Sequence, residues 1–245
     1  MTATYHFSSE QLIRSCPLPK SMFSHKSEHS LTIIASKVEP LSAFLKRNKK
    51  HLEYNVMEKL IETIGRQLHH LELDNKGISG FNLDDITVFY DITGTRDGTR
   101  DGTPDDAHDT TTDASIIHFA ITNEDKIHDI DDEHQLTINA PYQKEYTTTA
   151  ATTTKNIAFY SPEFKDFVSK KTLPYTLHFK SGYYSFGLLC VYCYISRSAA
   201  ASAKKDHDQA HDHEEILSSI VNTKIYWFLK RVLEENPSER RYICV

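Results

Sequence analysis

Several side chains that are well suited to bind a metal ion lie close together in one polar stretch, residues 206–213. The stretch interleaves three aspartates with three histidines, at Asp206, His207, Asp208, His211, Asp212 and His213. On a helix, His207 and His211 would share one face, a spacing that suits a transition metal. The low-complexity residues 199–205 before them favour a different interpretation, a solvated insertion near 198–215. A metal-binding protein stays open as a hypothesis.

A second pair of potential ligands is the C-x-x-C motif of Cys190 and Cys193. A redox or zinc site would place such a pair at a helix N-terminus or beside a second ligand pair. Both cysteines instead lie within the apolar run from Tyr183 to Ile195, which is typical of a buried helix. We therefore predict that both thiols belong to the hydrophobic core.

An acidic stretch at residues 91–113 contains three tandem Gly-Thr-x-Asp units. An EF-hand loop needs acidic residues at alternate positions and a closing glutamate, and the stretch has neither. We interpret it as a solvated low-complexity insertion near 93–114. Residues 128–154 are also polar, and they include threonines at 147–149 and 152–154. Phosphate on these threonines would switch the segment by adding charge, but an unregulated loop is the simpler interpretation.

The composition narrows the class of protein. A formal net charge of −6 argues against a nucleic-acid partner, and 39% hydrophobic residues are ordinary for a globular protein. Four cysteines do not make a disulfide framework, and the N-terminus lacks a signal-peptide pattern. The longest apolar run is shorter than the about 20 residues that span a bilayer. We expect a soluble cytoplasmic protein without a membrane partner.

The elements that position these residues follow from hydrophobic periodicity. Leu31–Ala35 predicts a strand, residues 37–40 a break, and residues 41–46 a short helix. Residues 53–71 carry an apolar stripe at helical spacing, and residues 116–121 predict another strand. In residues 1–28 the only signal is one capped helical turn near residues 8–13.

Three motifs in the C-terminal half occur in a familiar order. They are Ser161-Pro162-Glu163, then Tyr184-Ser185-Phe186-Gly187, then Asn236-Pro237-Ser238-Glu239-Arg240. Together they resemble the lower lobe of a protein kinase, where the family writes Ala-Pro-Glu, Asp-x-Trp-Ser-x-Gly and Asp-Pro-x-x-Arg. The resemblance implies an α+β, mostly α fold. It consists of a kinase-like C-terminal lobe over residues 31–245, with residues 1–30 as an extension or a remnant of the upper lobe.

The same resemblance places each catalytic residue of the kinase family at a position in this sequence. The general base falls on Gly80, the phosphate-contacting lysine on Asn82 and the metal-binding asparagine on Asp85. The metal-binding aspartate after the next strand falls on Asn123, which is followed by Glu124 and Asp125. Phosphoryl transfer depends on groups that accept the hydroxyl proton and neutralise the phosphate, and Gly80 and Asn82 do neither. Asp85 could hold a cation, and Glu124 or Asp125 could substitute as a ligand.

The residues that have structural roles in the kinase family match this sequence more closely than the catalytic residues do. The resemblance pairs Glu163 with Arg240, and a bidentate pair between them would tie the Ser-Pro-Glu turn to the last helices. Pro162, Ser185 and Gly187 match the family as structural residues. Gly182 replaces the aspartate that clamps the catalytic loop.

The sequence therefore predicts a pseudokinase, an interaction or scaffold module similar in architecture to the kinase non-catalytic C-lobe (KIND) modules. A protein partner of unknown identity and no cofactor are expected. The alternative is a divergent kinase that uses ATP and Mg²⁺, with Asp85 and Glu124 or Asp125 as metal ligands.

Overall fold

The computed structural model describes residues 2–48, 52–91, 116–139, 158–170, 173–194, 217–218 and 220–242. Both predicted insertions, near 93–114 and 198–215, lie outside the described residues. The histidine cluster at 207–213 and the threonines at 147–154 lie outside them as well.

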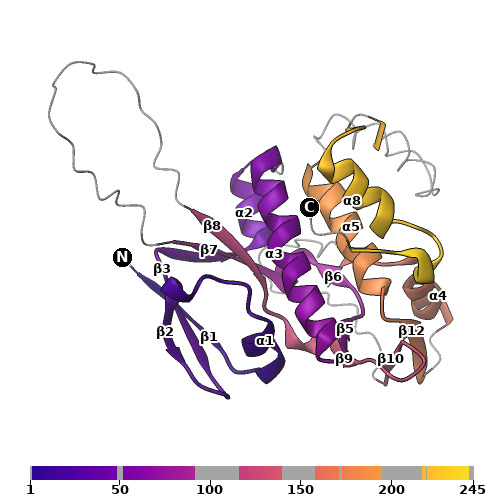
Figure 1. Ribbon diagram of the computed structural model, residues 1–245, viewed down its shortest axis with the longest axis horizontal. Helices are drawn as coiled ribbons and strands as arrows, with labels where there is room; N and C mark the ends of the chain where they lie inside the picture. Colours follow the sequence, from indigo (N-terminus) through magenta and orange to yellow (C-terminus); the bar gives the residue numbers. More distant parts are fainter. Residues whose placement is uncertain are drawn as a thin grey trace, which may run out of the picture.

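Within the described residues the fold class is α+β. Helices make up 45% of these residues and strands 28%, so helix predominates without being a majority. The described strands form small antiparallel sheets of two or three strands. Figure 1 shows the N-terminal strands at one end of the molecule, the helices α5 and α8 at the other, and the long helix α3 between them.

The first forty residues form more regular structure than the sequence predicts. The elements are β1 (Ala3–Phe7), α1 (Glu10–Ser15), a 3₁₀ turn (Lys20–Met22), β2 (Phe23–Lys26), β3 (Leu31–Ala35) and β4 (Lys37–Pro40). Helix α1 and strand β3 agree with the sequence, whereas β1 and β2 were not expected. Both pair antiparallel with β3, in the order β1-β3-β2. The segment expected to be an extension thus shares a sheet with the strand that follows it.

A second antiparallel sheet has the order β4-β7-β8, with β7 (Ile86–Tyr90) at its centre and β8 (Ile117–Ile121) at one edge. The residues expected to break the chain after β3 therefore form β4, a strand paired with β7. The two sheets pack together through aromatic rings. The centroid of the Phe89 ring lies 5.4 Å from that of Tyr5 and 6.3 Å from that of Phe7.

Two helices follow β4 in the sequence and precede the next strand, α2 (Leu41–Arg47) and α3 (Tyr54–Leu73). The predicted apolar stripe of α3 is buried at every position: Met57, Leu60, Ile61, Ile64, Leu68 and Leu71. Gln67 is also fully buried, and its amide bonds both backbone groups of Ile121 in β8, at 3.1 and 2.7 Å. The helix therefore satisfies part of the β8 backbone through one side chain.

The remaining described strands form two-stranded pairs: β5 (Lys76–Ile78) with β9 (Ile127–Asp129), β6 (Phe81–Asn82) with β11 (Ala158–Phe159), and β10 (Gln135–Ile138) with β12 (Tyr175–His178). The C-terminal half adds the helices α4 (Pro162–Lys170), α5 (Ser181–Tyr194) and α8 (Lys224–Val232). Short 3₁₀ turns cover Leu83–Asp85, Glu124–Lys126 and Pro237–Glu239.

Helix α5 is the buried helix that the sequence predicts. Its approach to α8 depends on Gly187, because a Cβ atom there would lie 2.7 Å from a methyl carbon of Val232. Cys190 and Cys193 are fully buried in the same helix, and burial raises the pKa of both thiols. Their predicted core position is therefore confirmed. Among the described helices, none combines the length and apolar character needed to cross a membrane.

Candidate functional site

The residues aligned with kinase catalytic positions gather around the turn between β6 and β7. Asp85 ends the 3₁₀ turn Leu83–Asp85, and Asn123 follows strand β8. Because β7 and β8 are neighbours, the two side chains meet: the Asn123 amide donates a hydrogen bond of 2.6 Å to Asp85 Oδ1. Glu124 and Asp125 are exposed on the next turn, and the backbone N–H of Asp125 donates to Asn123 Oδ1.

Both carboxylate oxygens of Asp85 serve as acceptors within the protein. Oδ2 accepts the backbone N–H of Asn82 at 2.6 Å, while Oδ1 accepts the Asn123 amide. The residue is only 3% exposed. A buried carboxylate needs such donors in order to stay ionised, and a cation could replace the amide only if that hydrogen bond broke. The geometry therefore suits a structural acceptor better than an open metal ligand.

Asn82 stands where the resemblance places a phosphate-contacting lysine. The residue is 5% exposed, so its amide lies inside the fold and not on an open surface. Its side chain is directed at the backbone N–H of Asp85, as in a capping box. The Asn82 Oδ1 atom is nevertheless buried without a hydrogen-bond partner among the described residues. Asn82 thus shapes the turn that holds Asp85.

Gly80, at the position of the general base, is enclosed by the strand β11 and the residue after it. A Cβ atom at Gly80 would lie 3.5 Å from the Phe159 carbonyl oxygen, 3.5 Å from a ring carbon of Tyr160 and 3.6 Å from Ser185 Oγ. These are ordinary contact distances, so a methyl group fits. A carboxylate would face a carbonyl oxygen and an aromatic ring, and the one donor among these neighbours, the Ser185 hydroxyl, already donates to the Phe159 carbonyl.

Ser185 joins the two strands that enclose Gly80. Its Oγ accepts the backbone N–H of Phe81 at 2.7 Å and donates to the Phe159 carbonyl. The residue is fully buried near the start of α5. One hydroxyl group thus links β6, β11 and α5, a role consistent with its predicted structural position.

The Ser-Pro-Glu motif begins helix α4. Ser161 Oγ accepts the backbone N–H of Phe164 at 3.2 Å, which makes Ser161 the N-cap of the helix. Pro162 occupies the first helical position, where its missing N–H is not needed. Glu163 then lies in the first turn, where a negative charge is favourable, and its side chain turns toward Arg240.

Arg240 forms the ion pair with Glu163 that the sequence predicts. Its side chain is fully buried, and two guanidinium nitrogens bond the two Glu163 oxygens, one of them at 3.1 Å. The other donors reach the backbone carbonyls of Glu234, Glu235 and Lys180 at 2.8, 2.9 and 3.5 Å. The guanidinium also lies 4.7 Å from the ring centroid of Tyr184. All five N–H groups therefore have acceptors.

The pKa of Glu163 reflects this pair. Burial alone would raise it, but hydrogen bonds from Arg240 and from the Ser181 hydroxyl lower it below the ordinary value of a glutamate. The carboxylate is therefore ionised at neutral pH and fixed in place between α4, the start of α5 and the C-terminal segment.

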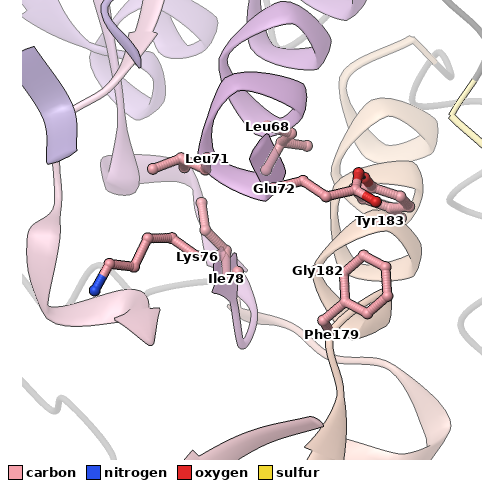
Figure 2. Close-up of a pocket in the computed structure, with 9 residues that line it drawn as sticks. Leu68, Leu71, Glu72, Lys76, Ile78, Phe179, Gly182 and Tyr183 are labelled. Carbon is pink, nitrogen blue, oxygen red and sulfur yellow. The ribbon is translucent and has the colours of Figure 1, made fainter. Parts of the chain in front are cut away.

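The start of α5 also packs closely against the strand that leads to Gly80. A Cβ atom at Gly182 would overlap the backbone carbonyl of Ile78, so only glycine fits there. A small cavity of about 10 Å³, room for about one water, lies beside this contact. Figure 2 shows Glu72 reaching toward Tyr183, which donates a hydrogen bond to it, while Lys76 points away. The cavity is a packing feature at this junction.

The comparisons with known proteins leave the family open. A scan against protein-family models found no match, and a search of curated proteins found no matching protein. Within the described residues, no group of three or more histidines, cysteines or carboxylates is placed to hold a metal ion.

One part of this arrangement was not predicted from the sequence, namely the enclosure of Gly80 by Phe159 and Tyr160. These residues are about 80 positions away, and their pairing with β6 has no local signal. The two-residue strand β11 is also too short for periodicity to reveal. The Asp85–Asn123 hydrogen bond joins two positions that the resemblance places in one site, although the resemblance does not itself predict the bond.

Proposed function

We propose that the chain is a kinase-like domain that has lost phosphoryl transfer and works as a protein-interaction module. The order of its elements supports the resemblance: a long helix, the turn at Gly80–Asp85, the β7–β8 pair, the Ser-Pro-Glu helix and the buried helix α5 follow one another. The Glu163–Arg240 pair supports it as well, because it joins the two motifs that the resemblance pairs.

The observation that carries the proposal is the hydrogen bond between Asp85 and Asn123. In protein kinases, phosphoryl transfer relies on metal ions held at these two positions. Here the Asn123 amide donates a hydrogen bond to the Asp85 carboxylate, so that one of the two positions supplies a donor to the other. Catalytic groups that act as a unit lose most of their effect when one fails, and Gly80 and Asn82 add two further losses.

The packing of the N-terminal sheet points the same way. Protein kinases hold the nucleotide phosphates under a Gly-rich loop of the upper lobe. In this chain the strand β1 packs directly onto β7 through Tyr5, Phe7 and the fully buried Phe89. Aromatic side chains therefore fill the contact between the two sheets, which favours a structural role for the N-terminal strands.

A thermal-shift titration with ATP and Mg²⁺, in parallel with ATP and EDTA, tests the loss of nucleotide chemistry. A ligand at 100 times its dissociation constant adds about 2.7 kcal/mol, or roughly 5–10 °C for a chain of this size. We expect no magnesium-dependent shift in the wild type or in Asp85→Asn. The proposal fails if the wild type shows such a shift, the Asp85→Asn variant loses it, and the wild type transfers phosphate to a protein substrate.

A further inference from the structure

The outer face of helix α8 carries the only tryptophan in the protein. Trp227 is 49% exposed, although tryptophan is usually among the more buried residues. Helix α8 lies on the outer side of α5 (Figure 1) and turns its apolar residues inward, namely Ile225, Phe228, Leu229 and Val232. The buried face of α8 is therefore formed without Trp227, whose indole packs on the ring of Tyr226 and leaves about half of its surface exposed.

Three cations surround the indole. Lys224, Lys230 and Arg231 lie three residues before, three after and four after Trp227, so all three neighbour it on the helix surface. The Lys230 ammonium lies 5.7 Å from the ring centroid. These four residues are called the α8 face below.

Within the described part of the chain, the cations of the α8 face form few ion pairs. There, neither Lys230 nor Arg231 forms an ion pair, and Lys224 has one contact of 3.7 Å, to Glu58. That contact joins side chains that are 59% and 37% exposed, and exposed pairs of this kind contribute little stability. All three cations can therefore accept new partners at little cost to the fold.

We propose that the α8 face binds an acidic amphipathic helix of a protein partner. The net charge of the protein is −6, so a local group of three cations around an aromatic ring runs against the overall charge. Tryptophan and arginine are the residues that most often dominate binding at protein interfaces. The inference deepens the proposed function, because it names the chemistry of the partner that an interaction module would take.

The spacing of the cations defines the partner. Lys224 and Arg231 are seven residues apart, about 10 Å along the helix axis. A partner helix with glutamates at positions i and i+7 has the same spacing. Leucines at i+3 and i+4 of that helix would then lie opposite Trp227, so that apolar and charged groups both find complements.

The test is binding of a fluorescently labelled peptide of about 15 residues to the full chain, measured by anisotropy. The peptide has glutamate at every seventh position, two leucines midway between glutamates, and glutamine elsewhere. We expect saturable binding that weakens as salt rises. Trp227→Ala should weaken binding at least tenfold, and Lys224→Glu/Arg231→Glu should abolish it. The double charge reversal should instead bind the matching peptide with lysine in place of glutamate.

Lys26→Glu is the matched control. Lys26 is also an exposed cation beside an aromatic ring, 5.8 Å from the centroid of Phe23, but it lies on β2 at the other end of the molecule (Figure 1). It should leave peptide binding unchanged. Equal losses in Lys26→Glu and in the α8 variants would show unspecific charge attraction and overturn the proposal.

Two other occupants would also overturn it. Binding of a DNA duplex that is stronger than peptide binding and is lost with Trp227→Ala would assign the face to nucleic acid. Concentration-dependent self-association in sedimentation, abolished by the same variant, would assign it to a second copy of the chain. The ATP titration is independent of all these outcomes, so failure of the α8 face and failure of the proposed function can be told apart.

Discussion

Replacing Arg240 with methionine tests how far the C-terminal segment holds the fold together. Methionine fills much of the same space but donates no hydrogen bond. Glu163 would keep its charge with only the Ser181 hydroxyl as a side-chain donor, and three backbone carbonyls would lose a partner. Breaking a buried ion pair in this way costs about 3–5 kcal/mol.

The lower end of that range applies here. The Glu163 side chain is 21% exposed, so water can solvate part of the stranded charge. We therefore expect a loss of about 3 kcal/mol in the free energy of unfolding, a large share of the roughly 5–15 kcal/mol of a typical domain. Arg240→Lys should fall between methionine and the wild type, because an ammonium keeps the charge without the bidentate geometry.

The assay is guanidinium unfolding followed by the fluorescence of Trp227, with Arg241→Met as the matched control. Arg241 is the next residue and its side chain is exposed, so its loss should change stability by less than about 0.5 kcal/mol. Glu163→Gln and the double variant complete a cycle that isolates the pair. A loss in Arg240→Met no larger than that in Arg241→Met would refute the reasoning.

Three further predictions address the enclosed turn and the half-buried histidines His118 and His128. Gly80→Ala should stay within about 1 kcal/mol of the wild type, while Gly80→Asp should lose roughly 3 kcal/mol or more in guanidinium unfolding, because the nearest donor, the Ser185 hydroxyl, is already bonded to the Phe159 carbonyl; equal stabilities would mean that Gly80 is open to solvent. Asn123→Asp places a second carboxylate against Asp85, so the variant should be less stable than the wild type at pH 7 and recover part of the difference near pH 5, as one carboxylate gains a proton; melting temperatures that differ equally at both values would count against it. Burial lowers the pKa of His118 and of His128, so the unfolded chain binds protons at a higher pH than the folded one. Stability should therefore fall as pH drops below about 6.5, and melting curves of His118→Gln and His128→Gln should show a smaller fall.

The long elements were predictable because each has a pattern that local sequence carries. The stripe of α3 and the apolar run of α5 are both buried as expected. The strand β1 escaped prediction because its alternation between exposed and less exposed residues covers only five positions, and β2 because its last three residues are all exposed and show no alternation. Their stability comes from pairing with β3, a partner that composition does not reveal.

The contacts of the candidate site likewise include some that could be predicted from the sequence and others that could not. The pair of Glu163 and Arg240 could be predicted because a motif resemblance supplied both partners. The cover over Gly80 could not, since it depends on the pairing of β6 with β11 across a long stretch of chain. The resemblance also said which catalytic groups were replaced, but not that Asn123 would bond Asp85 directly.

The last residues of the described chain have a consequence for synthesis on the ribosome. Tyr242 lies over Gly65 and donates a hydrogen bond to the carbonyl of Ile61, a contact between residues 181 positions apart. A growing chain that has not yet reached residue 240 leaves the Glu163 carboxylate without its counter-ion and the surface of α3 at Gly65 without the Tyr242 ring. At about 5–20 residues per second, that unfinished state lasts for roughly 10 to 35 seconds after Gly65 is made. A premature stop just before residue 240 would make the state permanent, so loss of Arg240 and Tyr242 should resemble a core mutation in its effect.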